Sequence, residues 1–312
     1  MTGLVKWREK GLALPQTPAE GVLAGLLSEN TVRAYRVDIR QFEYWMDEEG
    51  LKLADLTADH LVAYRDWLRA QYTPASVNRK LSVIRQFLDE ANSRGLIDHN
   101  PAERVRGIRT SSTYSPTEGL TREDARRLLD ATERDTLLGK RDYAILSLML
   151  RTGLRRAEVC GLTVGDLGAR EGHLVLRVVG KGGATRLVKV PVDVRRDLEE
   201  WLQAAGIAEG PVFRHVRKFG RGVDAEYRVV GGRPVTPEAI WLVVKRRVRA
   251  AGIEGKITPH SLRHTFVTLA LQGGAALHKV QYAAGHADPR TTERYDRQRD
   301  NLDDNAVDYV KI

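Results

Sequence analysis

From residue 258 the chain reads Thr258-Pro259-His260-Ser261-Leu262-Arg263-His264. Thr258 is a preferred N-cap residue, and Pro259 suits the first helical position because the backbone N–H there has no partner within the helix. The helix that follows would carry His260, Arg263 and His264 at spacings of three and four, on one face. We therefore expect a cluster of basic side chains at a helix start.

A second helix pattern follows this cluster. Leu277–Ala284 is predicted to be helical, Gly285 is the residue type that ends a helix, and His286 falls in the turn beyond. Asp288-Pro289 then predicts another helix start, which places Tyr295 about two turns along it. The sequence thus predicts a basic pocket suited to phosphate, with a phenolic hydroxyl nearby.

These motifs resemble the C-terminal signature of the tyrosine recombinases, the family of phage integrases and Xer-type resolvases. The signature comprises His260-x-x-Arg263-His264, then Gly285-His286, then a tyrosine nine residues later. The resemblance covers the chain from about Thr121 onward and implies an arginine in a Thr-Gly-x-Arg turn and a lysine in a β-hairpin upstream. The sequence departs from the family at Tyr282-Ala283-Ala284, where leucines are more common.

The upstream arginine follows an apolar helix predicted over Tyr143–Leu150, in the turn Thr152-Gly153-Leu154-Arg155. Gly153 permits a sharp turn, and a helix starting beyond it would direct free backbone N–H groups and Arg155 at one point. From the residues alone, Arg155 could equally be a helix-start arginine paired with Glu158. The resemblance makes Arg155 the first catalytic arginine, with Arg156 as the second candidate, and gives Glu158 the supporting acidic position.

The upstream lysine is Lys181. Two β-type runs, His173–Val179 and Leu187–Val190, flank a glycine-rich connection and predict a hairpin with Lys181 at its tip. A nucleotide-binding P-loop is excluded because Val175 stands where the first glycine is required, and glycine follows Lys181. A hairpin-tip lysine is ordinarily only solvated. The resemblance implies that Lys181 is the family's catalytic lysine.

The chemistry implied by the resemblance is cleavage of a DNA phosphodiester without a metal or other cofactor. Arg155 and Arg263 would bind the phosphate oxygens, because a guanidinium stays charged and can hold two oxygens at once. His286 and His264 would add donors. The pair His260 and His264 also resembles half of a zinc site, but Ser261 replaces the glutamate of that motif.

The same resemblance assigns the nucleophile and the proton transfers. Tyr295 would attack the phosphorus and form a 3′-phosphotyrosine that a 5′-hydroxyl later reverses. His260 would act as general base, and Lys181 would protonate the leaving 5′ oxygen.

Composition favours a polyanionic partner. Lys plus Arg exceed Asp plus Glu by nine, and the pI is near 9.7. The single cysteine, Cys160, fits a reducing compartment and excludes an intramolecular disulfide. No run has the pattern of a signal peptide or a membrane span, so we expect a soluble, cytoplasmic protein without a membrane partner.

Helical periodicity predicts a small bundle at the start of the chain, with helices from Asn30 to Gly50, from Thr57 and from Thr73-Pro74. Basic residues on its outward faces include Arg85, and another basic run lies on a helix predicted from Thr236-Pro237. A solvated surface would give the same pattern. Together with the C-terminal signature it predicts DNA contacts by Arg33, Arg36, Arg40, Arg79, Lys80, Lys245 and Arg246.

The predicted fold is mainly α with a small antiparallel β-sheet, in which a helical core-binding bundle and an α+β catalytic domain form a clamp around DNA. The boundaries are an irregular arm at 1–18, a SAM-like core-binding domain at 19–103, a linker at 104–118 and a catalytic domain with its tail at 119–312. Short strands are also expected at 211–213 and 227–230.

The predicted function is site-specific recombination of double-stranded DNA through a 3′-phosphotyrosine and a Holliday junction. A homotetramer would act on two DNA sites, with residues 301–312 docking on a neighbouring protomer, and a second recombinase or accessory protein remains open as a partner. The alternatives are a type IB topoisomerase-like enzyme, which would relax supercoils without pairing sites, and a catalytically silent architectural DNA-binding protein. A metal-dependent nuclease is disfavoured, and chelator sensitivity would test it.

Overall fold

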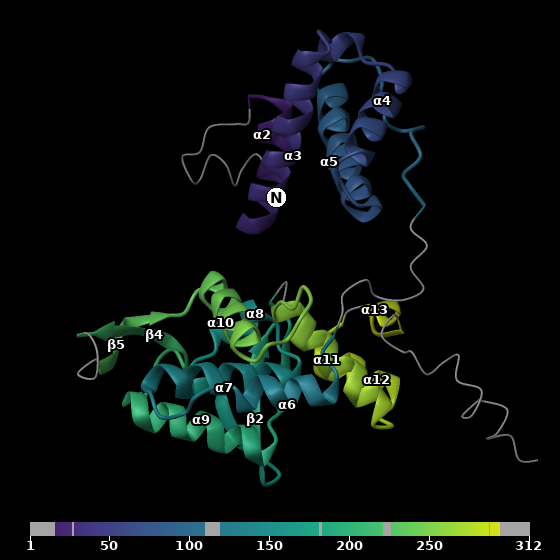
Figure 1. Cartoon of the computed structure of the whole chain (residues 1–312). Helices are drawn as coiled ribbons and strands as arrows, with labels where there is room; N and C mark the ends of the chain where they lie inside the picture. Colours follow the sequence, from purple (N-terminus) through teal and green to yellow (C-terminus); the bar gives the residue numbers. More distant parts are fainter. Residues whose placement is uncertain are drawn as a thin grey trace, which may run out of the picture. The chain divides into compact units, whose positions relative to one another are not determined.

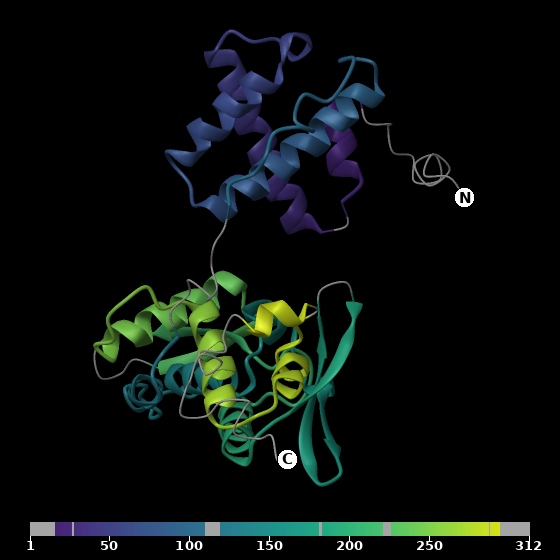
Figure 2. The same cartoon turned by 90° about the vertical axis from the view of Figure 1, so that its right-hand side faces the viewer.

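The computed structural model describes residues 16–26, 28–109, 119–180, 183–220, 226–286 and 288–293. The chain divides into two compact units, Met1–Ser111 and Ser112–Ile312, each with its own apolar core (Figures 1 and 2). As predicted, the described residues are mainly helical with small antiparallel sheets. None of the helices among them is both long and apolar enough to cross a bilayer.

The first unit is a helical bundle. Its helices are α2 (Pro18–Ala24), α3 (Glu29–Glu48), α4 (Ala58–Arg69) and α5 (Pro74–Ser93), with a 3₁₀ turn at Leu53–Asp55. Thr57 and Thr73 cap α4 and α5 as predicted, each accepting a hydrogen bond from the backbone three residues on. Helix α2 was not predicted from the sequence, although the capping pair Thr17 and Glu20 marks its start.

Aromatic rings form the centre of this bundle. Phe42 lies 4.8 Å from Tyr64 between ring centroids, in an edge-to-face arrangement, and Trp45 lies 5.1 Å from Tyr64. Such contacts add to the stabilisation that burial of the rings provides. The predicted apolar stripes of α3, α4 and α5 therefore meet in one core.

Lys80 does not lie on the outward face of the bundle, so that prediction was wrong. Its side chain is 6% exposed, and its Nζ donates to Asp38 Oδ1 at 2.8 Å and to Gln41 Oε1 at 2.7 Å. The physical reason is Asp38, a buried carboxylate on α3 that needs a cation beside it. Arg79 also pairs with Asp38 but keeps half of its side chain exposed.

The second unit is built around α7 (Leu137–Thr152), which is buried along most of its length. It packs against α9 (Val192–Ala205) and α11 (Pro259–Gln272), as Figure 1 shows. The remaining helices are α6 (Arg122–Asp130), α8 (Arg156–Gly161), α10 (Pro237–Ala250), α12 (Leu277–Ala284) and α13 (Pro289–Glu293), with a 3₁₀ turn at Val164–Asp166.

Two antiparallel sheets lie in the part of this unit that the structure describes. One has the order β1 (Leu167–Arg170), β2 (His173–Val179) and β3 (Thr185–Lys189), and includes the predicted hairpin. The other pairs β4 (Arg214–Phe219) with β5 (Glu226–Pro234). The strand predicted at 211–213 was wrong, because Pro211 makes only an isolated bridge to Thr163, and Val212 and Phe213 are buried beyond it.

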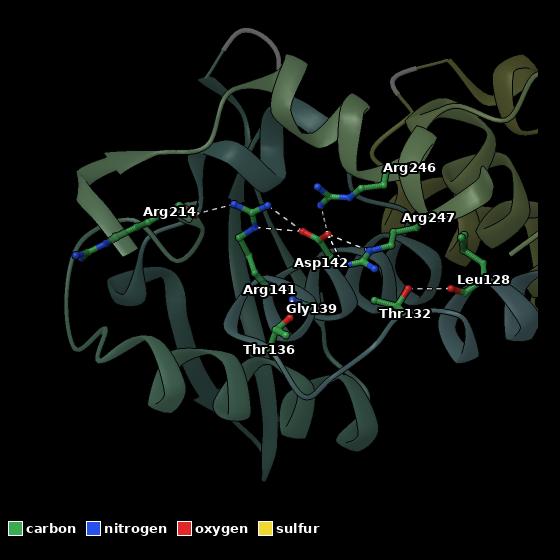
Figure 3. A network of polar contacts seen from close by, with 9 residues as sticks. All are labelled: Leu128, Thr132, Thr136, Gly139, Arg141, Asp142, Arg214, Arg246 and Arg247. Carbon is green, nitrogen blue, oxygen red and sulfur yellow. Dashed lines mark hydrogen bonds and ion pairs between the residues drawn. The ribbon is translucent and has the colours of Figure 1, made fainter. Parts of the chain in front are cut away.

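A fully buried carboxylate, Asp142 on α7, fixes α10 in place (Figure 3). Its Oδ2 accepts hydrogen bonds from Arg246 and, at 3.0 Å, from Arg247, while its Oδ1 accepts from Arg141 at 2.9 Å. Arg141 also donates to the backbone carbonyl of Arg214 at 3.4 Å. The basic run of α10 is thus divided: Arg247 is buried, and Arg246 keeps 48% of its side chain exposed.

Candidate active site

Arg155 is positioned by the turn between α7 and α8. Gly153 ends α7 with a φ of 65°, a conformation that favours glycine, and a Cβ there would lie 2.3 Å from the ring of Phe266. Arg155 follows as the N-cap of α8. The predicted sharp turn is confirmed, and it brings Arg155 next to the end of a buried helix.

One carboxylate, Glu158, is shared by two arginines. Its Oε1 accepts from Arg155 Nη1 at 2.9 Å and from Arg186 Nη1 at 2.9 Å, and its Oε2 accepts from Arg186 Nη2 at 3.0 Å. Burial alone would raise the pKa of Glu158, but the hydrogen bonds from Arg186 and Arg155 hold it below its usual value. The Arg155–Glu158 pair that the helical spacing allows is present, and Glu158 is held in its ionised form.

Arg186 was not among the predicted site residues. It lies on β3 and follows the glycine-rich connection that contains Lys181. A signal was available, because Arg186 alternates with Val188 and Val190, two buried residues, and therefore points to the same face of the strand. A charged residue on a buried face requires a partner, and the sequence offered no way to identify Glu158 as that partner.

The two arginines also hold the end of α12. Arg155 Nη2 donates to the carbonyl of Gly285 at 2.8 Å, and Arg186 Nε donates to the carbonyl of Ala283 at 3.3 Å. Gly285 ends α12 as predicted, with a φ of 65°, and a Cβ there would lie 2.8 Å from the guanidinium carbon of Arg186. The segment that leads to His286 is therefore fixed by cations from two other elements.

The predicted cap of α11 is confirmed: Thr258 accepts a hydrogen bond from the backbone of Ser261, with Pro259 in the first turn. Arg263 is buried, and its Nη1 donates to the carbonyl of Gly153 at 2.7 Å. A pocket lies here, lined by Arg155, Arg156, Ala157, Trp241, Thr258, Pro259, His260 and Arg263. Burial, then the charges of Arg263 and Arg155, lower the pKa of His260.

His286 lines a second pocket, which also includes Arg155, Gly180 and Arg186. Its Nδ1 lies 2.8 Å from the hydroxyl of Thr292, and both residues are buried. Burial, followed by the charges of Arg263 and Arg155, lowers the pKa of His286 to about 3. The ring is therefore neutral near pH 7.

His264 does not share either pocket, in contrast to the prediction of one basic face. It lines a different pocket with Gly119, Thr121 and Thr268, and its Nδ1 lies 3.2 Å from the Thr268 hydroxyl. The reason is helical geometry: the positions of His260, Arg263 and His264 spread over about 100° of the helix circumference at 3.6 residues per turn. As α11 packs against its neighbours, Arg263 therefore faces one pocket and His264 faces another.

Lys181 and Tyr295 lie outside the described residues, as do residues 301–312. The described part of the chain ends one residue before Lys181 and two residues before Tyr295. Gly180 lines the pocket that contains Arg155 and His286. The helix predicted from Asp288-Pro289 is present as α13, whose last residue, Glu293, is two positions before Tyr295.

The phage integrase family matches residues 118–301, more than half of the chain. This chain belongs to the phage integrase family. The N-terminal SAM-like domain of phage integrases matches residues 23–95. This integrase-family protein is accordingly a tyrosine-type site-specific recombinase, as predicted, and that activity is favoured over the topoisomerase-like and non-enzymatic alternatives.

Curated relatives support the same assignment for this recombinase. The tyrosine recombinase XerD of Pseudomonas aeruginosa is 33% identical over 290 residues, which cover 93% of this chain and 88% of that protein. The tyrosine recombinase XerC of Myxococcus xanthus is 34% identical over 270 residues, which cover 86% of this chain and 87% of that protein.

Solved structures support the fold of the recombinase. A XerH site-specific recombinase bound to a palindromic difH substrate has a TM-score of 0.70 at 20% identity, over 90% of this chain and 80% of that one. A lambda integrase tetramer bound to a Holliday junction has a TM-score of 0.67 at 16% identity, over 94% of this chain and 76% of that one.

Proposed function

We propose that this recombinase cleaves and rejoins DNA through Tyr295, with the scissile phosphate bound between Arg155, Arg263, His260 and His286. The observation that carries the proposal is the convergence of these four side chains on pockets that share Arg155. They come from the start of α8, the first turns of α11 and the loop after α12. Burial lowers the pKa values of His260 and His286 most, and the charges of Arg263 and Arg155 lower them further, so positive charge of the kind that a phosphate site requires lies near both rings.

The arginines would neutralise the charge that develops on the non-bridging oxygens. Arg155 is pre-oriented by Glu158 and Gly285, and Arg263 by Gly153, so neither guanidinium needs to reorganise when phosphate binds. His286 would donate a further hydrogen bond from its neutral ring. His260, in the first turn of α11, has a pKa below its ordinary value and would take the proton from Tyr295.

Tyr295 and Lys181 would complete the reaction. Attack by the Tyr295 oxygen forms the phosphotyrosine bond and breaks the bond to the 5′ oxygen, which Lys181 would protonate. Support for Lys181 comes from its position beside Gly180, and for Tyr295 from its position two residues after α13. A 5′-hydroxyl of a second strand would reverse the step, through a Holliday junction, without a metal or cofactor.

The DNA interface would extend over both units. Arg33, Arg36, Arg40 and Arg79 are exposed on the helical bundle, and Lys245 and the half-exposed Arg246 lie on α10. We propose that residues 19–103 bind the core of a duplex site, that 104–118 link this domain to the catalytic domain at 119–312, and that four copies act on two sites in the cytoplasm. Lys80 is not part of this interface because it is buried against Asp38.

The test is trapping of the covalent intermediate. The full chain is incubated, with a chelator present, with a pool of nicked duplexes made from its host's DNA, and SDS-resistant adducts are collected. We expect an adduct that disappears in Tyr295→Phe, and the captured DNA identifies the site. An adduct of equal yield in Tyr295→Phe, or one that forms only without the chelator, would contradict the proposal.

A further inference from the structure

The contact between Thr292 and His286 has a direction that determines what the imidazole can do. A neutral imidazole carries one N–H donor and one acceptor nitrogen, and the partner of one nitrogen fixes the state of the other. Here the partner of Nδ1 is the Thr292 hydroxyl, 2.8 Å away and fully buried on α13. A hydroxyl can donate or accept, so its own surroundings decide the direction.

Those surroundings leave the hydroxyl proton of Thr292 available for His286. Buried threonines in other helices of this chain donate to the carbonyl four residues earlier: Thr152 to Leu148 at 2.6 Å and Thr265 to Ser261 at 2.9 Å. Within the described ranges, Thr292 makes no such bond, and its one hydrogen bond is the contact with His286. A buried hydroxyl proton without an acceptor is costly, so donation to Nδ1 is the favourable arrangement.

The proposed phosphate ligand requires the same direction of the hydrogen bond between Thr292 and His286. The oxygens of a phosphodiester carry no proton, so a histidine that binds them must present an N–H. The His286 ring is kept neutral by burial and by Arg263 and Arg155, so it has a single N–H to offer. Because Nδ1 is occupied by Thr292, that N–H belongs on Nε2.

We propose that Thr292 is a positioning residue of this recombinase: its hydroxyl donates to His286 Nδ1 and fixes the ring as the Nε2–H tautomer, which presents a donor to the substrate phosphate. This inference rests on the proposed role of His286. Thr292 precedes Tyr295 by three residues in the sequence. The same hydrogen bond therefore joins the loop that carries His286 to α13, which precedes the proposed nucleophile in the sequence.

The primary test is nuclear magnetic resonance of the full chain, labelled with ¹⁵N in histidine, without DNA. His286 is assigned from the signals that disappear in His286→Gln. We expect a protonated Nε2 and an unprotonated Nδ1 whose resonance bears the shift of a hydrogen-bond acceptor. In Thr292→Val, which keeps the shape but removes the hydroxyl, the Nδ1 resonance should move to the position of an imidazole nitrogen without a donor. Thr292→Ser should retain the wild-type spectrum.

The neighbouring Thr291 provides the matched control, because it is half-buried on the same helix and Thr291→Val removes the same group. Thr291→Val should leave the His286 resonances in place. A protonated Nδ1 in the wild type, or an unchanged Nδ1 resonance in Thr292→Val, would overturn the proposal. This readout needs no catalysis, so it is independent of whether the proposed function is correct.

Single-turnover adduct formation then measures the consequence. Thr292→Val should slow the covalent step about tenfold to a hundredfold, since a misplaced donor loses transition-state contact, while duplex affinity is retained. Thr292→Ser and Thr291→Val should stay within about threefold of the wild type, as neither removes the donor. A Thr292→Val enzyme with wild-type rate would overturn the positioning role. Loss of the adduct in the wild type as well would count against the proposed function and leave the spectroscopic test decisive for Thr292.

Discussion

Arg186 donates to both carboxylate oxygens of Glu158, at nitrogen–oxygen distances of 2.9 and 3.0 Å, with side chains that are 10% and 5% exposed. Arg186→Ala should therefore lower the free energy of unfolding of the second unit by about 3 kcal/mol, the lower end for a broken buried ion pair, because Glu158 keeps Arg155. Urea-dependent hydrogen exchange of the α7 amides measures this value.

Arg177→Ala is the matched control for that measurement. Arg177 lies on the neighbouring strand β2 and pairs with Asp166, but 61% of its side chain is exposed. Its removal should cost less than about 1 kcal/mol, as is usual for surface ion pairs. Equal costs for the two variants would show that the buried pair is not a stabilising element.

Because Glu158 is ionised in the folded protein, the free energy of unfolding should depend on pH. Its folded-state pKa is held below the usual value of 4.5, so its contribution is fully present above about pH 4.5 and is lost as the pH falls through the lowered pKa. The difference in unfolding free energy between the wild type and Glu158→Gln should be constant from pH 5 to 7 and shrink on further acidification. A difference that grows in acid would contradict the assignment.

Arg155→Lys and Arg263→Lys should each slow adduct formation about a hundredfold or more, which is the effect of losing one preorganised donor at a developing oxyanion. Lysine keeps the charge but cannot reproduce the forked contacts to Glu158 and Gly285, or the contact to Gly153. Single-turnover kinetics on nicked duplex measures the rate, and a separate titration measures affinity.

Arg151→Lys is the control for this pair. Arg151 precedes Arg155 by four residues, lies on α7 and makes a half-exposed contact of 3.5 Å with Asp193. We expect a rate within about twofold of the wild type, because exposed pairs of this kind contribute little. If the lysine variants of Arg155 and Arg263 behaved like this control, the phosphate site would lie elsewhere.

His286 should remain neutral through the physiological range. Its pKa is lowered from 6.5 to about 3, so the unfolded chain takes up a proton below pH 6.5 while the folded protein does not. The contribution of His286 to stability is thus full above pH 6.5 and declines as the pH falls toward 3. In a titration followed by histidine nuclear magnetic resonance, its signals should not move between pH 7 and 5; a midpoint in that interval would refute the neutral ring.

The basic residues of the first unit should separate into two classes. Arg33→Ala and Arg36→Ala should each reduce the slope of log affinity against log salt by about one, because each removes a phosphate contact. Lys80→Met should leave the slope unchanged and instead destabilise the bundle, since it leaves Asp38 buried with less charge compensation. A lower salt slope in Lys80→Met would show instead that Lys80 contacts DNA.

The ends of helices could be predicted from the sequence, whereas the partners of buried charges could not. The cap at Thr258 and the left-handed end at Gly285 follow local rules and were predicted to the residue, because the signal lies within one turn of the helix. The pairing of Lys80 with Asp38 joins residues 42 positions apart. Which distant charge a residue meets depends on how helices and strands pack, and a single sequence contains no local signal for it.

The family signature singled out Arg155, His260, Arg263 and His286 because their order and spacing are distinctive as a set, and these four residues line two pockets that share Arg155. It did not single out Arg186 or Thr292, whose contacts around that set are visible only in the structure. For His264 the signature was misleading: the residue belongs to it, yet packing of α11 places its side chain in another pocket.

Burial, then the charges of Arg263 and Arg155, lower the pKa values of His260 and His286. Arg155 shares the carboxylate of Glu158 with Arg186 and lines a pocket with Arg263, so the three guanidiniums belong to one cluster. Their mutual repulsion opposes folding, and an oxyanion bound among them would cancel it. Ligand binding and conformational stability are therefore linked through one cluster of charge. A melting temperature that rises with sulfate, and rises less in Arg263→Lys, would report occupancy of the site before any DNA sequence is known.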